Sequence, residues 1–299
     1  MSSLQRILAT TDFSTPAEHA VARAATLARD QGAALTLLHV VERELFETLH
    51  ALVGAVDQRI ESRVLDEVRT KLAAFGQRIG EQDGVEVTTE LRCGVVAAEI
   101  AEYAQAMAAD LIVLGAWGAG FIRQFVPGST AARAIRKSQR PLLATKQQGH
   151  RPYRRVLIPV DFSPWSAGAV HIARAVAPDA ELLLLHAFTV PFEGLLFLAG
   201  VADDALDDYR VAAKNEAIAQ LRQFTEDAGL RGPRTSTLAK LGEPVPVILD
   251  QEQEFGCDLI VLGKHGRSVT EELLLGSVTS HIVAQSNCDV LVASRETGP

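Results

Sequence analysis

The chain contains two copies of one sequence pattern, and this internal repeat limits its possible folds more than any other feature. The segment RILATTDFSTPAEHAVARAATLA (6–28) matches RVLIPVDFSPWSAGAVHIARAVA (155–177), and ADLIVLGAWG matches CDLIVLGKHG. Equivalent positions keep an almost constant offset: Asp12 and Asp161, His39 and His186, Gly94 and Gly242, Gly115 and Gly263. Each copy is long enough to fold around its own core. We therefore predict two domains, residues 1–147 and 153–299, joined by a polar stretch.

Within each copy, short apolar runs alternate with helical patterns. Runs such as ALTLLHVV and DLIVLG lack the polar alternation of half-exposed strands, so they are expected to be buried strands. A long charged helical pattern runs from residue 42 to about residue 82, and its counterpart runs from about 202 to 228. Alternating strands and helices predict an α/β fold, with a doubly wound, five-stranded parallel sheet in each copy. The expected strand order is 3-2-1-4-5.

Composition excludes some classes of partner. The 299 residues are 47% hydrophobic and 22% charged, which is typical of a soluble globular protein. A net charge of −8 argues against a general affinity for nucleic acid, which needs clustered Lys and Arg. An anionic ligand can still bind locally, through backbone N–H groups that a charge count does not include.

The remaining sequence signals favour a cytoplasmic protein with no metal site. The three cysteines are far apart in sequence, so neither a disulfide framework nor a CxxC motif is indicated. The histidines lack the spacing of a zinc helix. The most apolar run (182–202) contains His186, Pro191 and Glu193, and is predicted to form a buried strand, a loop and the start of a packed helix rather than a membrane span.

Two strand ends in each copy carry candidate binding residues. Asp12 and Asp161 follow the first strand of their copies, where the sequence Asp-Phe-Ser precedes an apolar helix. Each aspartate could cap that helix or accept hydrogen bonds from a ribose or an adenine amine. With the expected strand order, the first and fourth strands are neighbours where the winding reverses, which is where such sheets bind ligands.

A glycine pattern follows the fourth strand in both copies. Gly115 and Gly118 are followed after nine residues by Gly128-Ser129, and the same spacing recurs from Gly263 to Ser277. Glycines let successive N–H groups face an anion, and Gly-Ser at a helix start adds a hydroxyl and the positive end of the helix dipole. The alternative is an ordinary connection in which the second glycine only caps the next helix. The pattern is neither a Walker A loop nor GxGxxG.

These motifs together resemble the universal stress protein family, and the chain resembles its tandem two-domain members. The resemblance rests on DFS after the first strand, LLHV at the second, and GxxG-x9-G[ST] after the fourth. It implies an adenine-nucleotide-binding fold, with ATP, ADP or AMP as ligand and Mg²⁺ as an optional companion. It also implies pairing of the two domains through their last strands into a pseudo-dimer, with homodimerisation as a further possibility. Protein partners stay unknown.

Carried over by position, the family pattern favours a site in the second copy. The residues expected around the base, ribose and phosphates there are Pro159, Asp161, Ala187, Gly263, His265, Gly266, Gly276, Ser277, Val278 and Thr279. Lys264 could approach a phosphate but is expected to be a solvated loop lysine, and His186 is expected to have a hydrogen-bonded structural role.

The first copy departs from the pattern and is expected to bind nucleotide more weakly or not at all. Trp117 stands at the His265 position and Ala131 at the Thr279 position. A missing hydroxyl would remove one hydrogen bond, a loss of about 1 kcal/mol. The candidate residues in this copy are Asp12, Val40, Gly115, Gly118, Gly128, Ser129 and Thr130.

Three functions follow from these features. The leading hypothesis is a universal stress protein that acts as a nucleotide-binding regulatory module of the stress response. The second is a slow ATPase or nucleotide hydrolase, although no general base is evident and no catalytic residue is assigned. The third is a scaffold that binds a different small ligand.

Overall fold

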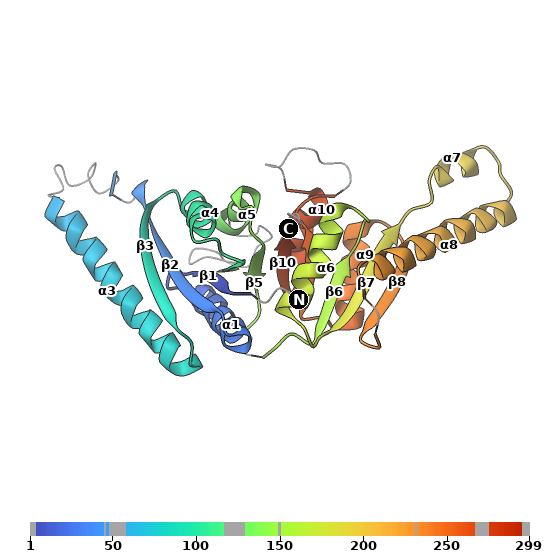
Figure 1. Ribbon diagram of the computed structural model, residues 1–299. Coiled ribbons are helices and arrows are strands. Elements are labelled where there is room, and N and C mark those ends of the chain that lie inside the picture. The colour runs from blue at the N-terminus through green and yellow to red at the C-terminus, as the bar shows by residue number, and fades with distance from the viewer. Residues whose placement is uncertain are drawn as a thin grey trace. The chain divides into compact units, whose positions relative to one another are not determined.

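The chain forms two compact units, Met1–Pro152 and Tyr153–Pro299 (Figure 1). The computed structural model describes residues 4–44, 46–47, 58–116, 129–148, 151–230, 232–266 and 275–294. In each unit, helices cover both faces of a parallel sheet.

The first unit has the strand order β3-β2-β1-β4-β5, with every pair parallel. Its strands are β1 (Arg6–Thr10), β2 (Ala34–Glu42), β3 (Val87–Gly94), β4 (Leu111–Gly115) and β5 (Leu142–Thr145). Helices α1 (Thr15–Gln31) and α3 (Gln58–Asp83) pack on one face, and α4 (Val96–Ala106) and α5 (Ser129–Lys137) on the other.

The second unit repeats this arrangement in the order β8-β7-β6-β9-β10. Its strands are β6 (Arg155–Pro159), β7 (Glu181–Phe188), β8 (Thr235–Leu241), β9 (Leu259–Gly263) and β10 (Asp289–Ala293). Helices α6 (Pro164–Val176) and α8 (Asp203–Asp227) pack on one face, and α9 (Pro244–Phe255) and α10 (Ser277–Gln285) on the other. Counted along each repeat, the order is 3-2-1-4-5, which confirms the predicted fold class.

The apolar runs form the buried centre of each sheet. The identical sequences LIVLG of β4 and β9 are buried in all but their final glycine. A central parallel strand is covered on both faces, so it needs apolar side chains at every position. This is why these runs show no polar alternation.

A tight turn joins the first strand of each unit to its first helix. Phe13 and Phe162 have positive φ angles of 61° and 62°, which bend the chain sharply after β1 and β6. The N-cap residues are Ser14 for α1 and Ser163 for α6, each followed closely by a proline. The preceding aspartates therefore stand two positions before the helix caps.

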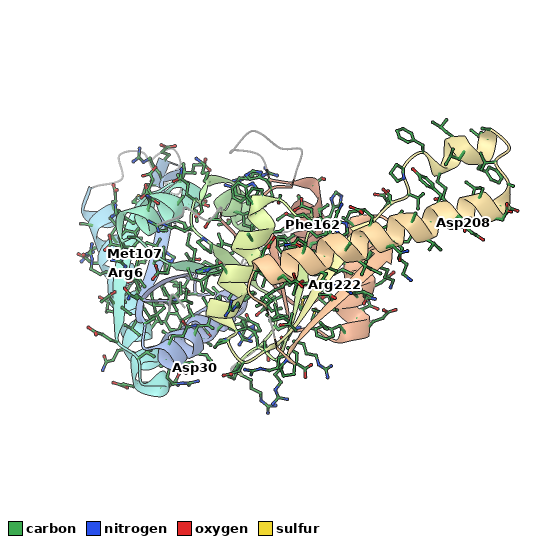
Figure 2. The ribbon with its side chains drawn as sticks, turned by 45° about the vertical axis from the view of Figure 1, so that its right-hand side comes forward. Arg6, Asp30, Met107, Phe162, Asp208 and Arg222 are labelled. Atoms are coloured by element: carbon green, nitrogen blue, oxygen red, sulfur yellow. The ribbon has the colours of Figure 1, made fainter. Side chains whose placement is uncertain are left out.

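The helix start predicted to pack within 182–202 is wrong. Helix α7 (Glu193–Leu198) has no buried residue, and Phe197 and Leu198 are 68% and 80% exposed. The reason is that α7 contacts α8, whose outer part extends beyond the sheet (Figure 1). Figure 2 labels Asp208 on this outer part and Arg222 nearer the sheet. Among the described helices, none combines the length and apolar character needed to cross a membrane.

Candidate functional site

A cavity of about 260 Å³ lies at the carboxyl ends of the second unit's central strands. This volume is near the lower end of the range for small-molecule sites. All ten residues predicted for the second copy line it: Pro159, Asp161, Ala187, Gly263, His265, Gly266, Gly276, Ser277, Val278 and Thr279. They come from β6, β7, the loop after β9, and the first turn of α10, so the topology brings four distant segments together.

Six further residues line the same cavity and were missed from the sequence: Val160, Ser166, Leu185, Pro244, Ile248 and Leu262. Pro244 and Ile248 lie one turn apart at the start of α9. The signal that could have found them is the repeated block around Gly242, which matches in both copies. Most of the six are apolar, which gives the cavity a hydrophobic wall.

The Asp161 carboxylate is partly engaged in its own turn. Its Oδ1 accepts hydrogen bonds from the backbone N–H of Ser163 at 3.0 Å and from the Ser166 hydroxyl at 2.7 Å. Its Oδ2 faces the glycine loop, because a Cβ added to Gly266 would lie 3.0 Å from that oxygen. One carboxylate oxygen therefore orders the turn and the other is directed at the loop after β9.

Bonds within the glycine loop engage two of its predicted phosphate donors. The Gly276 N–H donates to the Lys264 carbonyl at 3.0 Å, and the Thr279 hydroxyl donates to the Gly263 carbonyl at 2.8 Å. These bonds fix the start of α10 against the end of β9. Donors at the helix start then come from Ser277 and Val278, because the first N–H groups of a helix have no intrahelical partner.

Gly263 is required by packing. A Cβ at this position would lie 2.5 Å from the Cβ of Trp165, in the first turn of α6. At Gly276 a Cβ would lie 3.3 Å from the Lys264 carbonyl oxygen, which is a tight contact. Both glycines thus let backbone segments approach closely, and that approach shapes the cavity.

His265 and Lys264 are both buried, with exposures of 5% and 7%. The His265 ring packs edge-on against Trp165, with ring centroids 4.7 Å apart. The expectation of a solvated Lys264 is therefore wrong. Its backbone N–H donates to the Ala293 carbonyl at the end of β10, so this residue continues the sheet instead of entering an open loop.

The equivalent histidines His39 and His186 have matching structural roles. Each Nδ1 donates to a backbone carbonyl after the first strand of its unit, to Thr11 at 2.7 Å and to Val160 at 2.8 Å. Each ring packs on the phenylalanine of the tight turn. Burial lowers the pKa of His39. These contacts hold the turn in place.

In the first unit, part of the predicted site lies outside the described residues. The predicted Gly118 and Gly128 lie outside the described residues, as does the side chain of Ser129. Thr130 lines a separate cavity of about 140 Å³ with residues 42–44, 94–97 and Arg133, and none of Asp12, Val40 and Gly115 lines it. The Asp12 Oδ1 accepts the Ser14 N–H at 3.0 Å.

The buried Ala131 clarifies what the first copy has lost. Its counterpart Thr279 donates a hydrogen bond to the Gly263 carbonyl, which tethers α10 to the end of β9. Alanine cannot make this tether to Gly115. The first repeat therefore lacks the equivalent of this bond between the helix start and the fourth strand.

Comparison with known proteins identifies the family. The model of the Universal stress protein family matches residues 3–146 and again 152–294. The chain belongs to the universal stress protein family. The two matches, taken with the repeated sheet, make it a tandem member.

Individual relatives agree with this assignment. The chain is 33% identical over 147 residues to the universal stress protein YxiE of Bacillus subtilis, covering 47% of this chain and 98% of YxiE. It is 24% identical over 294 residues to the universal stress protein Mb2028c of Mycobacterium bovis, covering 94% of each chain. A universal stress protein structure from Archaeoglobus fulgidus shares the fold, with a TM-score of 0.73 and 20% identity over 97% of this chain and 98% of that one.

Proposed function

We propose that this chain is a nucleotide-binding regulatory module of the stress response that holds ATP, ADP or AMP mainly in its second repeat. The observation that supports this function is the convergence of four chain segments on one cavity. The cavity has an apolar wall, and the first residues of helix α10 line it, where an anion can bind. Family membership supports the same function, because the sequence resemblance implies adenine-nucleotide binding.

The apolar wall is suited to a nucleotide base. Val160 just after β6, Leu185 in β7 and Ile248 in α9 line the cavity with carbon atoms. Burying a planar base against such side chains is favourable, and orientation then depends on a few polar groups. The base would lie between these elements, with the Asp161 carboxylate close enough to the central strand ends to accept from a ribose hydroxyl.

The start of α10 is suited to phosphates. Ser277 is the first residue of this helix, its side chain is exposed, and it lines the cavity with Val278. First-turn N–H groups and the helix dipole favour a negative charge at this end. Mg²⁺ would accompany the phosphates as part of the ligand.

Regulation would come from a difference in nucleotide affinity between two states of the protein. Bound nucleotide can shift a conformational or partner-binding equilibrium only by the amount of that difference. The first repeat would bind nucleotide more weakly, because Ala131 lacks the hydroxyl group with which Thr279 bonds to the end of β9. Pairing of the repeats through their last strands, homodimerisation and a cytoplasmic location stay predictions.

Calorimetric titration with ATP tests the proposal on the intact chain. Ser277→Ala removes one hydroxyl donor from the cavity, so we expect affinity to fall roughly tenfold, as for a hydrogen bond to a charged group. Ser280→Ala is the matched control, since it removes the same group from the same helix three residues further on. Gly276→Val should abolish binding, because its side chain would press on the Lys264 carbonyl.

The other functions predict different results. No ATP binding by the wild-type chain would contradict the proposal and favour a scaffold for another small ligand. Phosphate release well above background, lost in Gly276→Val, would favour a slow nucleotide hydrolase instead. Equal affinities in Ser277→Ala and Ser280→Ala would place the phosphates elsewhere than at α10.

A further inference from the structure

Two of the three cysteines, distant in sequence, meet in the core of the second unit. The sulfur atoms of Cys257 and Cys288 lie 3.8 Å apart, although the residues are 31 positions apart in the chain. Both are free thiols, with exposures of 8% and 1%. Cys257 lies just before β9 and Cys288 immediately before β10, at the end of the strands opposite the nucleotide cavity.

One buried glutamate holds the backbones of both cysteines. The Glu252 backbone carbonyl accepts the Cys257 N–H at 3.2 Å, and its Oε1 accepts the Cys288 N–H at 2.7 Å. The same Oε1 accepts the N–H of Asn287 at 2.6 Å. Glu252 is 4% exposed and is fixed by these bonds. The hydrogen bonds to Glu252 therefore hold the backbones that carry the two thiols, in addition to side-chain packing.

We propose that Cys257 and Cys288 are an oxidation site that closes into an intramolecular disulfide under hydroperoxide stress. A disulfide bond is about 2.05 Å long, so each sulfur needs to move only about 1 Å from its present place. We expect rotation of the two side chains to supply this shift, with the backbone positions that Glu252 fixes unchanged.

The reaction balances with a hydroperoxide as oxidant. One cysteine loses its thiol proton and its thiolate attacks the peroxide; the O–O bond breaks, a sulfenic acid forms, and the other oxygen takes up that proton and leaves as water or an alcohol. The second thiol then attacks the sulfenic sulfur, the S–O bond breaks, and the departing hydroxide takes the thiol proton to form water. Cys257 is the more exposed residue of the pair, so we expect its thiolate to attack the peroxide first.

Reactivity at this site should be slow. The hydrogen bond with Cys257, and then burial, raise the pKa of the Cys288 thiol. A raised pKa keeps the thiol protonated at neutral pH, and the thiolate is the nucleophile. The attack of the Cys288 thiol on the sulfenic acid is therefore expected to be slow at neutral pH.

The disulfide would close a covalent ring around the chain segment that carries the glycine residues of the cavity. Residues 257–288 include β9, the glycine residues from Gly263 to Gly276, and α10. Closing a loop of this length restricts the unfolded chain strongly. We expect oxidation to raise the midpoint of thermal unfolding of the second unit by several degrees.

Mass spectrometry of the intact chain tests the bond directly. The wild-type protein is treated with hydrogen peroxide, denatured in N-ethylmaleimide and digested without reductant. The expected product is one cross-linked peptide pair containing Cys257 and Cys288, two hydrogens lighter than the reduced pair, while Cys93 is alkylated. Alkylation of both cysteines, sulfinic acid at either one, or a bond between two chains would overturn the proposal.

Thermal unfolding before and after peroxide tests the consequence. The midpoint should rise in the wild type and in Cys93→Ala, and should not change in Cys257→Ala. Cys288→Ser provides a second variant should the first fold poorly. An equal rise in the wild type and in either variant of the pair would show that stabilisation comes from another oxidation, which contradicts the proposal. Neither experiment depends on nucleotide binding.

Discussion

Gly266, in the loop after β9, lies close to the Asp161 carboxylate. An added Cβ would lie 3.0 Å from Oδ2 of that side chain. The carboxylate cannot retreat freely, because its Oδ1 accepts hydrogen bonds from Ser163 and Ser166. The spacing between loop and carboxylate is therefore set by the absence of a side chain at this glycine.

We expect Gly266→Ala to weaken ATP binding by about tenfold, because the methyl group displaces the carboxylate from the cavity at a cost near that of one hydrogen bond. Calorimetric titration measures the affinity. Gly194→Ala is the control, since a Cβ there meets no atom within 4 Å. Unchanged affinity in Gly266→Ala would show that Asp161 does not contact the ligand.

His39 makes the stability of the first unit depend on pH. Burial lowers its pKa below the ordinary value of 6.5, against the opposing effect of its hydrogen bond to the Thr11 carbonyl. The unfolded chain therefore binds the proton more readily than the folded chain does. The stabilisation is fully present above pH 6.5 and is lost as the pH falls through the lower folded pKa.

Urea unfolding at about pH 7.5 and about pH 5.5 measures this effect. We expect the free energy of unfolding of the first unit to fall more in the wild type than in His39→Gln, which has no imidazole to protonate. His19→Gln, on α1, should retain the wild-type loss. The same loss in all three proteins would assign the pH dependence to other groups.

At the scale of elements, hydrophobicity predicted strands better than it predicted burial of the α7 segment. The strands were predictable because a central parallel strand is apolar at every position, as in LIVLG. Helix α7 has the same apolar composition, but its main packing partner among the described elements is α8, and Leu195 is 62% exposed. Apolar sequence predicts burial only where the topology supplies a covering element, and one segment cannot reveal that.

Two leucines on neighbouring elements test this difference. Leu221 in α8 is 2% exposed, whereas Leu198 in α7 is 80% exposed. We expect Leu221→Ala to reduce the free energy of unfolding by about 2 to 5 kcal/mol, and Leu198→Ala to change it by less than about 0.5 kcal/mol. Denaturant unfolding measures both. A large loss from Leu198→Ala would show that α7 is covered in solution.

At the scale of the whole molecule, the repeat made the fold predictable. It did not predict which side chains from distant parts of the sequence come into contact. The ten cavity residues could be assigned because the pattern of the resembling family carries over by position to the strand ends and helix start of the second copy. The burial of Lys264 and the meeting of Cys257 with Cys288 could not be assigned. Both depend on how β9 and β10 align side by side, and neither has a local sequence signal.

The two repeats should respond differently to nucleotide. At a concentration one hundred times its Kd, a ligand stabilises the folded unit that binds it by about 2.7 kcal/mol. We expect ATP to slow hydrogen exchange in peptides of the second unit, with little change in the first. Mass spectrometry with ATP, and with Gly276→Val as control, measures this. Equal protection of both units would contradict the proposed weaker site in the first repeat.

The outer part of α8 has a consequence for how this family member can vary. Helix α8 has 25 residues, which corresponds to about 37 Å, and its buried residues are Leu206, Ala217 and Leu221. Whole turns can be added or removed between Leu206 and Ala217, where α8 has no buried residue, without leaving a hole in the sheet layers. The length of the outer part of α8 can therefore change during evolution while the cavity keeps its shape. A reporter tag can be inserted there for the same reason.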